Sequence, residues 1–132
     1  MTCLYYTIDR RPSIELIDLL LEKGMDANET HHNLSCIKNS RTIKIFFLLL
    51  LHNAEIDDSS FDNKPEFLNL IEDLKNHQLW KIERHKLFPL KFKSIVFLML
   101  LVHRFYFKAY FSKHLLFVIF NFTAFSTYQI KI

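Results

Sequence analysis

Glycine is almost absent from this sequence: Gly24 is the only one among 132 residues, and there are only three prolines. β-Sandwiches and β-barrels need many turns, which glycine and proline usually provide, so the composition disfavours both. Phosphate-binding loops and dinucleotide-binding motifs also need glycine, because the backbone must approach the ligand without intervening side chains. The shortage of these residues therefore predicts an all-α fold and argues against a nucleotide-dependent enzyme.

Cysteine is also scarce, since only Cys3 and Cys36 are present. Two cysteines make no disulfide framework, and they suit small buried positions in a protein of a reducing compartment. The first residues lack the basic segment and the apolar run of a signal peptide, so we expect a cytoplasmic location. The chain contains no G-x-S-x-G or H-E-x-x-H motif, the patterns of two large hydrolase classes. We therefore expect no catalysis and no cofactor.

Charges and aromatic residues are divided unevenly along the chain. Residues 1–76 contain 8 Lys and Arg against 13 Asp and Glu, whereas residues 77–132 contain 9 against 1. The second part also holds 14 of the 20 aromatic residues. The chain thus has an acidic front part and a basic, aromatic back part, which predicts different surroundings for the two.

Residues 13–28, SIELIDLLLEKGMDAN, carry the clearest helical pattern. Their apolar residues recur at one-, three- and four-residue spacings, which indicates a helix buried over much of its circumference. Ser13 suits the first turn, where its hydroxyl can accept a hydrogen bond from a backbone N–H. Gly24 suits the left-handed position just after a helix end. The pattern predicts a helix of about three turns.

The same pattern recurs 29 residues later. The shift aligns Ile14 with Ile43, residues 19–21 with 48–50, Gly24 with Asn53, and residues 25–28 with 54–57. Asparagine is the best substitute for glycine in the left-handed conformation, so the second copy keeps the same helix end. An internal repeat is stronger evidence about the fold than any single-residue motif.

A short apolar segment precedes each copy: residues 2–8 precede the first and residues 32–38 the second. With these segments, the front part resembles an ankyrin repeat array, whose T-P-L-H-x-A signature is partly kept at Thr2, Leu4 and Thr7. The resemblance implies that each unit is a helix pair and that neighbouring pairs stack. It therefore implies a first helix in both residues 2–8 and residues 32–38.

The resemblance covers residues 1–58 and departs from the family in repeat length. Ankyrin units have about 33 residues, and the unit here has 29, although Leu34 keeps the leucine of the signature. The missing residues fall in the segment 29–33, which we expect to be too short for a full β-hairpin finger. Solenoids normally need at least three units, so we expect the rest of the chain to cap the two.

Residues 59–78 form a connector with one further predicted helix. Pro65 and Glu66 suit its first turn, and apolar residues follow helical spacing from Phe67 to Lys75. This segment is either a plain connector or a degraded third repeat.

Residues 79–132 form a basic aromatic tail. Pro89 suits the first turn of a helix that runs to about Tyr106, and a second helix is expected near residues 112–122. The tail is similar to the helical C-terminal segments, some of them F-box-like, that follow the repeats in certain ankyrin proteins. We expect its apolar residues mainly to build a core, because charged residues interrupt each apolar run before the ~20 residues of a membrane span.

The function implied by the resemblance is protein–protein binding through loop tips and inner helices. On this interpretation, the partner-contact residues are Tyr5, Glu29, Thr30, His31, His32, Ser35, Asp57 and Asp58. The partner itself and the oligomeric state are not specified by the sequence. Two alternatives remain open: an adaptor subunit of a ubiquitin-ligase-type assembly that binds through residues 79–132, and membrane-surface binding through residues 89–122.

Two ligand classes are disfavoured. His31, His32 and Cys36 bring three donor side chains together in sequence, but their spacing matches no standard zinc pattern, so we expect no metal. Trp80 with its basic neighbours has the composition of a single-strand stacking site, yet a tryptophan beside Leu79 and Ile82 is more often part of a core. Nucleic-acid binding is therefore not expected.

Overall fold

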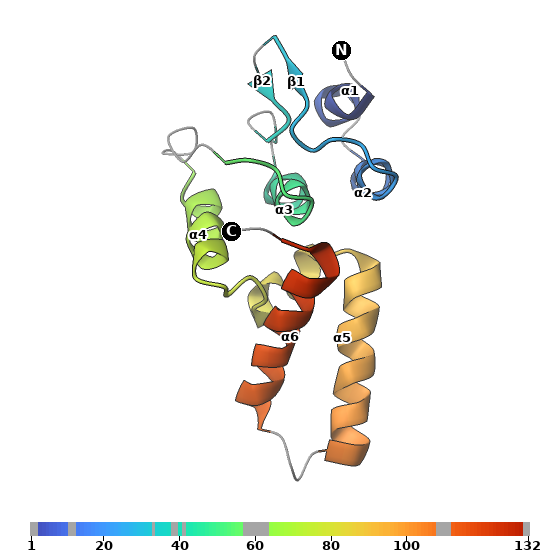
Figure 1. The fold of residues 1–132 in the computed structure, drawn as a ribbon, viewed down its shortest axis with the longest axis vertical. Helices are drawn as coiled ribbons and strands as arrows, with labels where there is room; N and C mark the ends of the chain where they lie inside the picture. Colours follow the sequence, from blue (N-terminus) through green and yellow to red (C-terminus); the bar gives the residue numbers. More distant parts are fainter. Residues whose placement is uncertain are drawn as a thin grey trace. The chain divides into compact units, whose positions relative to one another are not determined.

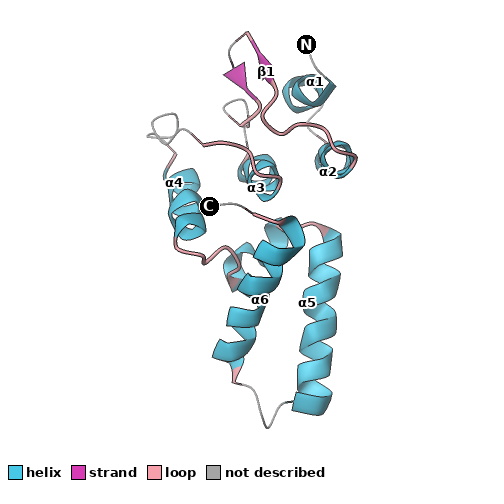
Figure 2. Cartoon of the chain, in the orientation of Figure 1, coloured by secondary structure: helices cyan, strands magenta, loops and turns pink. Residues whose placement is uncertain are grey.

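The computed structural model describes residues 3–10, 13–32, 34–37, 40, 42–56, 64–107 and 112–130. These residues are mostly helical, and the strands among them are two segments of two residues each (Figure 2). The helical fold class predicted from composition is thereby confirmed. The chain divides into two compact units, Met1–Glu72 and Asp73–Ile130, and the boundary falls inside helix α4 (Pro65–Lys75).

The first unit contains three helices that lie side by side. These are α1 (Cys3–Arg10), α2 (Ile14–Glu22) and α3 (Ile43–Leu51), and α2 packs against both of the others. Figure 1 shows all three nearly end-on. Between α2 and α3, strands β1 (Thr30–His31) and β2 (Leu34–Ser35) pair antiparallel. The helix predicted at residues 13–28, its second copy and the first helix at residues 2–8 are therefore all present.

The two copies of the repeat begin and end in the same way. Ser13 and Thr42 each accept a hydrogen bond from the backbone N–H three residues later, which caps α2 and α3. At the other end Gly24 has φ +95° and Asn53 has φ +63°, as their repeat positions predict. In each copy the left-handed residue and the one after it, Gly24 and Met25 or Asn53 and Ala54, donate to carbonyls of the last helical turn, which is the Schellman arrangement.

Burial distinguishes the two copies. In α3 every residue from Ile45 to Leu51 is buried, whereas α2 buries only Ile17 and Leu21 fully. Part of this difference comes from α4, where Phe67 stacks on Phe46 with ring centroids 4.4 Å apart. The apolar sequence of α2 therefore resembles that of α3, but only α3 has a continuous buried stretch, from Ile45 to Leu51.

Among residues 32–38, those that the structure describes do not form the helix that the ankyrin resemblance implies for the second unit. Leu34 and Ser35 form strand β2, and Cys36 and Ile37 follow in a turn. Residues 29–33 were expected to be too short for a full β-hairpin finger, and the ladder here is short: Thr30 and His31 pair with Ser35 and Leu34, and His32 adopts φ +51°. The N–H of Cys36 extends the pairing by donating to the carbonyl of Glu29. Hydrogen bonds across the hairpin thus replace those of a helical turn.

The second unit is built on two helices that run side by side in opposite directions (Figure 1). After the 3₁₀ helix η2 (Ile82–Leu87) come α5 (Leu90–Val102), the π-helical segment η3 (His103–Phe107) and α6 (Lys113–Tyr128). Pro89 precedes α5, and the side chain of Ser112 caps α6. Both predicted tail helices are therefore confirmed, although the second extends six residues beyond residue 122.

The core of the second unit is aromatic. Trp80 is 6% exposed and lies against Phe120, with ring centroids 4.8 Å apart, which confirms the prediction that this tryptophan is buried. Phe88 and Phe92 stack at 4.4 Å. In α5, however, only Phe92 and Val96 are buried. The expectation that the apolar run from Ile95 to Val102 mainly builds a core is therefore wrong for most of its residues. No helix among the described residues is long and apolar enough to cross a membrane.

Candidate functional site

The predicted contact residues of the hairpin gather on the first unit. The ring of His31 lies 5.3 Å from that of Tyr5 on α1 and 4.1 Å from that of His32. Thr30 and His32 are exposed, and Glu29, His31 and Ser35 are half-buried. Tyr5 is only 5% exposed, so it packs against His31 of the hairpin and offers little surface to a partner. Asp57 and Asp58 lie outside the described residues.

Cys36 is fully buried beneath this hairpin. Burial raises the pKa of its thiol to about 12, and the carboxylates of Glu29 and Asp26 contribute in the same direction. Because only a thiolate is a strong nucleophile or a zinc ligand, a neutral Cys36 serves neither purpose near neutral pH. Within the described ranges, no group of three His, Cys, Asp or Glu side chains is placed to hold a metal ion.

A second candidate site lies entirely within the second unit. A cavity of about 530 Å³ opens between the segment after α4 and one side of α6, and it is lined by Asn76, His77, Gln78, Trp80, Lys81, Phe117, Val118, Asn121, Phe122 and Phe125. Four of these side chains are aromatic, and there is no carboxylate, thiol or hydroxyl among them. The cavity is thus suited to hold an apolar group, with amides at its polar side.

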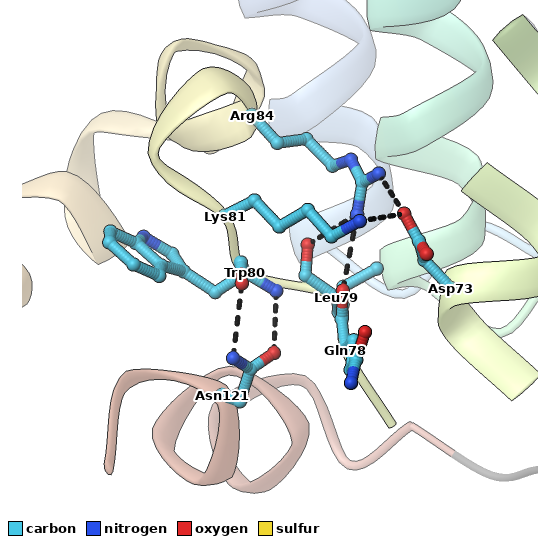
Figure 3. A network of polar contacts seen from close by, with 7 residues as sticks. All are labelled: Asp73, Gln78, Leu79, Trp80, Lys81, Arg84 and Asn121. Carbon is cyan, nitrogen blue, oxygen red and sulfur yellow. Dashed lines mark hydrogen bonds and ion pairs between the residues drawn. The ribbon is translucent and has the colours of Figure 1, made fainter. Parts of the chain in front are cut away.

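Asn121 joins the two walls of this cavity (Figure 3). Its Oδ1 accepts a hydrogen bond from the backbone N–H of Trp80 at 2.7 Å, and its Nδ2 donates to the backbone carbonyl of Trp80 at 3.0 Å. The same Nδ2 also donates to the carbonyl of Phe117 at 3.2 Å. Both backbone groups of Trp80 are therefore satisfied by one side chain that lies 41 residues further along the chain.

Asp73 organises the other side of the Trp80 segment. Its carboxylate pairs with Arg84 and, at 2.9 Å, with Lys81. Arg84 also donates to the carbonyls of Gln78 and Leu79 at 3.2 and 2.9 Å (Figure 3). Burial alone would raise the pKa of Asp73, but the hydrogen bonds from Arg84 and Lys81 outweigh it, so the pKa lies below its ordinary value.

These ion pairs bear on the disfavoured nucleic-acid interpretation. Lys81 and Arg84, two of the basic neighbours of Trp80, are both held by Asp73. Trp80 itself donates its Nε1 proton to Nδ1 of His85 at 3.3 Å, and its ring is buried. The structure therefore gives this tryptophan a packing role. Sequence reasoning missed Asp73 and Asn121, because their roles depend on partners well separated in the chain: Lys81 and Arg84 for Asp73, and Trp80 for Asn121.

Three histidines, His31, His52 and His85, have lowered pKa values, which predicts that acid weakens the fold. Burial lowers the pKa of His52, against a smaller opposite effect of Glu22, and burial together with Lys93 lowers that of His85. Below its ordinary pKa the unfolded chain then binds more protons than the folded chain. The free energy of unfolding should therefore fall between about pH 7 and pH 5.

Urea unfolding at a series of pH values tests this expectation. The double variant His52→Gln/His85→Gln should show a shallower fall with decreasing pH, and glutamine at position 85 keeps an acceptor for Trp80. His114→Gln, at an exposed position of α6, is the matched control and should keep the wild-type dependence. A free energy of unfolding that stays level or rises on acidification would contradict the prediction.

In comparisons with known protein families, curated proteins and solved structures, nothing matches this chain. The resemblance of the front part to ankyrin repeats therefore stays an expectation from the sequence.

Proposed function

We propose that the first unit binds a protein partner through the surface of the β1–β2 hairpin, without catalysis. The observation that carries the proposal is that this hairpin has exposed polar side chains and packs against helix α1. Thr30 and His32 face solvent, while the hairpin rests on Tyr5 through His31. The side chains that would meet a partner are thus polar, and the scaffold beneath them is apolar.

Hydrogen bonds between the two repeat copies support a rigid base for this surface. The Oδ1 of Asn28 accepts from the N–H of Glu55 at 2.7 Å, and its Nδ2 donates to the carbonyl of Asn53 at 3.5 Å. The N–H of Asn28 in turn donates to Asp26 at 2.9 Å. A surface that is already ordered loses little conformational entropy on binding, which favours selective recognition. We infer an ankyrin-type stacking of the two copies from this connection and their matching helix ends.

Affinity capture with matched variants tests the proposal. The double variant Thr30→Ala/His32→Asn removes both exposed side chains, and asparagine tolerates the positive φ of position 32. Lys44→Ala, on the exposed side of α3, is the control. We expect a partner that wild type and control retain and the hairpin variant loses, with a drop in affinity of about tenfold for two interface side chains.

The result that would overturn the proposal is equally specific. If the hairpin variant captures the same proteins in the same amounts as wild type, the β1–β2 surface is not the contact. Circular dichroism of the variant must show wild-type helix content, so that loss of capture is not loss of folding.

A further inference from the structure

The second unit leaves an unusual amount of apolar surface uncovered. Helix α5 has apolar side chains on all sides, and such helices are normally buried. Seven large side chains of α5, η3 and α6 are at least 60% exposed, and we call them the exposed apolar surface: Leu90, Phe97, Leu98, Phe105, Tyr106, Val118 and Phe122. Isolated exposed apolar residues are common, but a concentration of this kind marks an interaction surface.

The spacing of the exposed residues shows that they follow the helices. Val118 and Phe122 are four residues apart and lie on one side of α6, with Leu115 one turn before them. On α5, Leu90 is 78% exposed and lies two turns from Phe97 on the same side. The surface is therefore extended along helix faces rather than confined to a loop.

Positive charge accompanies this surface throughout. No Asp or Glu occurs between Arg84 and the last residue of the chain. Lys91, Arg104 and Lys113 are exposed beside the apolar residues, and the guanidinium carbon of Arg104 lies 5.8 Å from the centre of the Phe105 ring. Lysine and arginine next to phenylalanine and leucine are typical of helices that lie in the interface of anionic membranes.

Charge and shape favour a lipid over other occupants. A second copy docking with the same surface would bring like charges together, which opposes association. A protein partner would need a matching cavity for each exposed ring. Acyl chains conform to any such outline, and long basic side chains extend to the headgroups while their stems stay apolar.

We propose that α5, η3 and α6 dock on an anionic phospholipid surface, lying along it rather than crossing it. The exposed apolar surface enters the boundary between headgroups and acyl chains, and Lys91, Arg104 and Lys113 bind the phosphate and carboxylate groups. This goes beyond the protein-binding function proposed for the first unit and involves other residues.

Cosedimentation of the full chain with vesicles tests the proposal. Wild type should sediment with vesicles of phosphatidylcholine and phosphatidylserine, far less with phosphatidylcholine alone, and less as salt is added. Lys91→Gln/Arg104→Gln should weaken binding about fivefold for each charge removed. Phe97→Gln/Phe105→Gln should also weaken it strongly, because apolar insertion is lost.

Two variants of the first unit are the matched controls. Leu19 is 49% exposed and Lys44 is exposed, so Leu19→Gln and Lys44→Gln remove an exposed apolar side chain and an exposed charge that belong to the first unit. Both should bind vesicles like wild type, and circular dichroism should show unchanged helix content in all variants.

Three results would overturn the proposal. The first is wild type that stays in the supernatant with anionic vesicles. The second is unchanged binding by both double variants. The third is self-association in sedimentation velocity that Phe97→Gln/Phe105→Gln abolishes, which would assign the exposed apolar surface to a second copy of the chain.

Discussion

Replacing Leu48 by alanine is expected to lower the free energy of unfolding by about 3 kcal/mol, whereas Leu19→Ala should lower it by less than about 1 kcal/mol. The two leucines occupy the same position in the two repeat copies. Leu48 is 2% exposed inside α3, and Leu19 is 49% exposed on α2. Truncating the first leaves a cavity lined by apolar neighbours, and truncating the second removes a side chain already half in water.

Urea denaturation of the two variants and wild type measures this difference. Because both substitutions replace leucine by alanine at the same position of a nine-residue helix, the change in helix propensity is similar in both and largely cancels in the comparison. Equal losses of stability in the two variants would contradict the prediction, since they would show that α2 is as enclosed as α3.

Replacing Asn121 by leucine is expected to cost about 2–3 kcal/mol, although the two side chains are similar in size. The variant deprives the backbone N–H and carbonyl of Trp80 of the partners that now lie 2.7 and 3.0 Å away. Leaving a partly buried donor and acceptor without hydrogen bonds is more costly than losing the same bonds in water. The segment around Trp80 should then detach from α6.

Fluorescence of Trp80, the only tryptophan, reports both stability and local environment. In Asn121→Leu its emission should shift to longer wavelength as water reaches the ring. Asn76→Leu is the matched control, because Asn76 lines the same cavity but is exposed, and its effect should stay within about 0.5 kcal/mol. Similar effects of both substitutions would refute the special role of Asn121.

One proposed binding surface lies in the acidic front part of the chain, and the other lies in the basic back part. The hairpin of the first unit offers polar side chains on a supported base, and the second unit offers exposed rings beside basic residues. Each has its own variants and its own readout, so failure of the capture experiment leaves the vesicle experiment interpretable. The reverse also holds.

Helix positions could be predicted well from the chain because their signals are local. Ser13, Gly24 and Asn53 act on backbone groups within a few residues of themselves, and the structure places each at the predicted helix end. Pro89 and Ser112 mark the starts of α5 and α6 in the same way. Because these hydrogen bonds form between residues close in the chain, the sequence alone indicates where the helices begin and end.

The hairpin was not predictable on the same grounds. Residues 32–38 carry an apolar pattern that suits a helix or a strand, and the ankyrin resemblance favoured the helix. The choice depends on pairing across the chain, since Leu34 and Ser35 bond to His31 and Thr30 while Cys36 bonds to Glu29. His32 enables this by accepting a positive φ, a property that is uncommon for histidine.

By itself, the sequence determined a helical chain with a repeated capped helix and a basic aromatic end, because caps, periodicity and composition act over short distances. The tertiary structure alone decided which equivalent residues are enclosed. Leu48 is buried and Leu19 half-exposed, and Phe92 is buried while Phe97 is 60% exposed. The physical reason is that burial depends on which elements pack around a helix, and α2, α3 and α5 are all apolar enough to be enclosed.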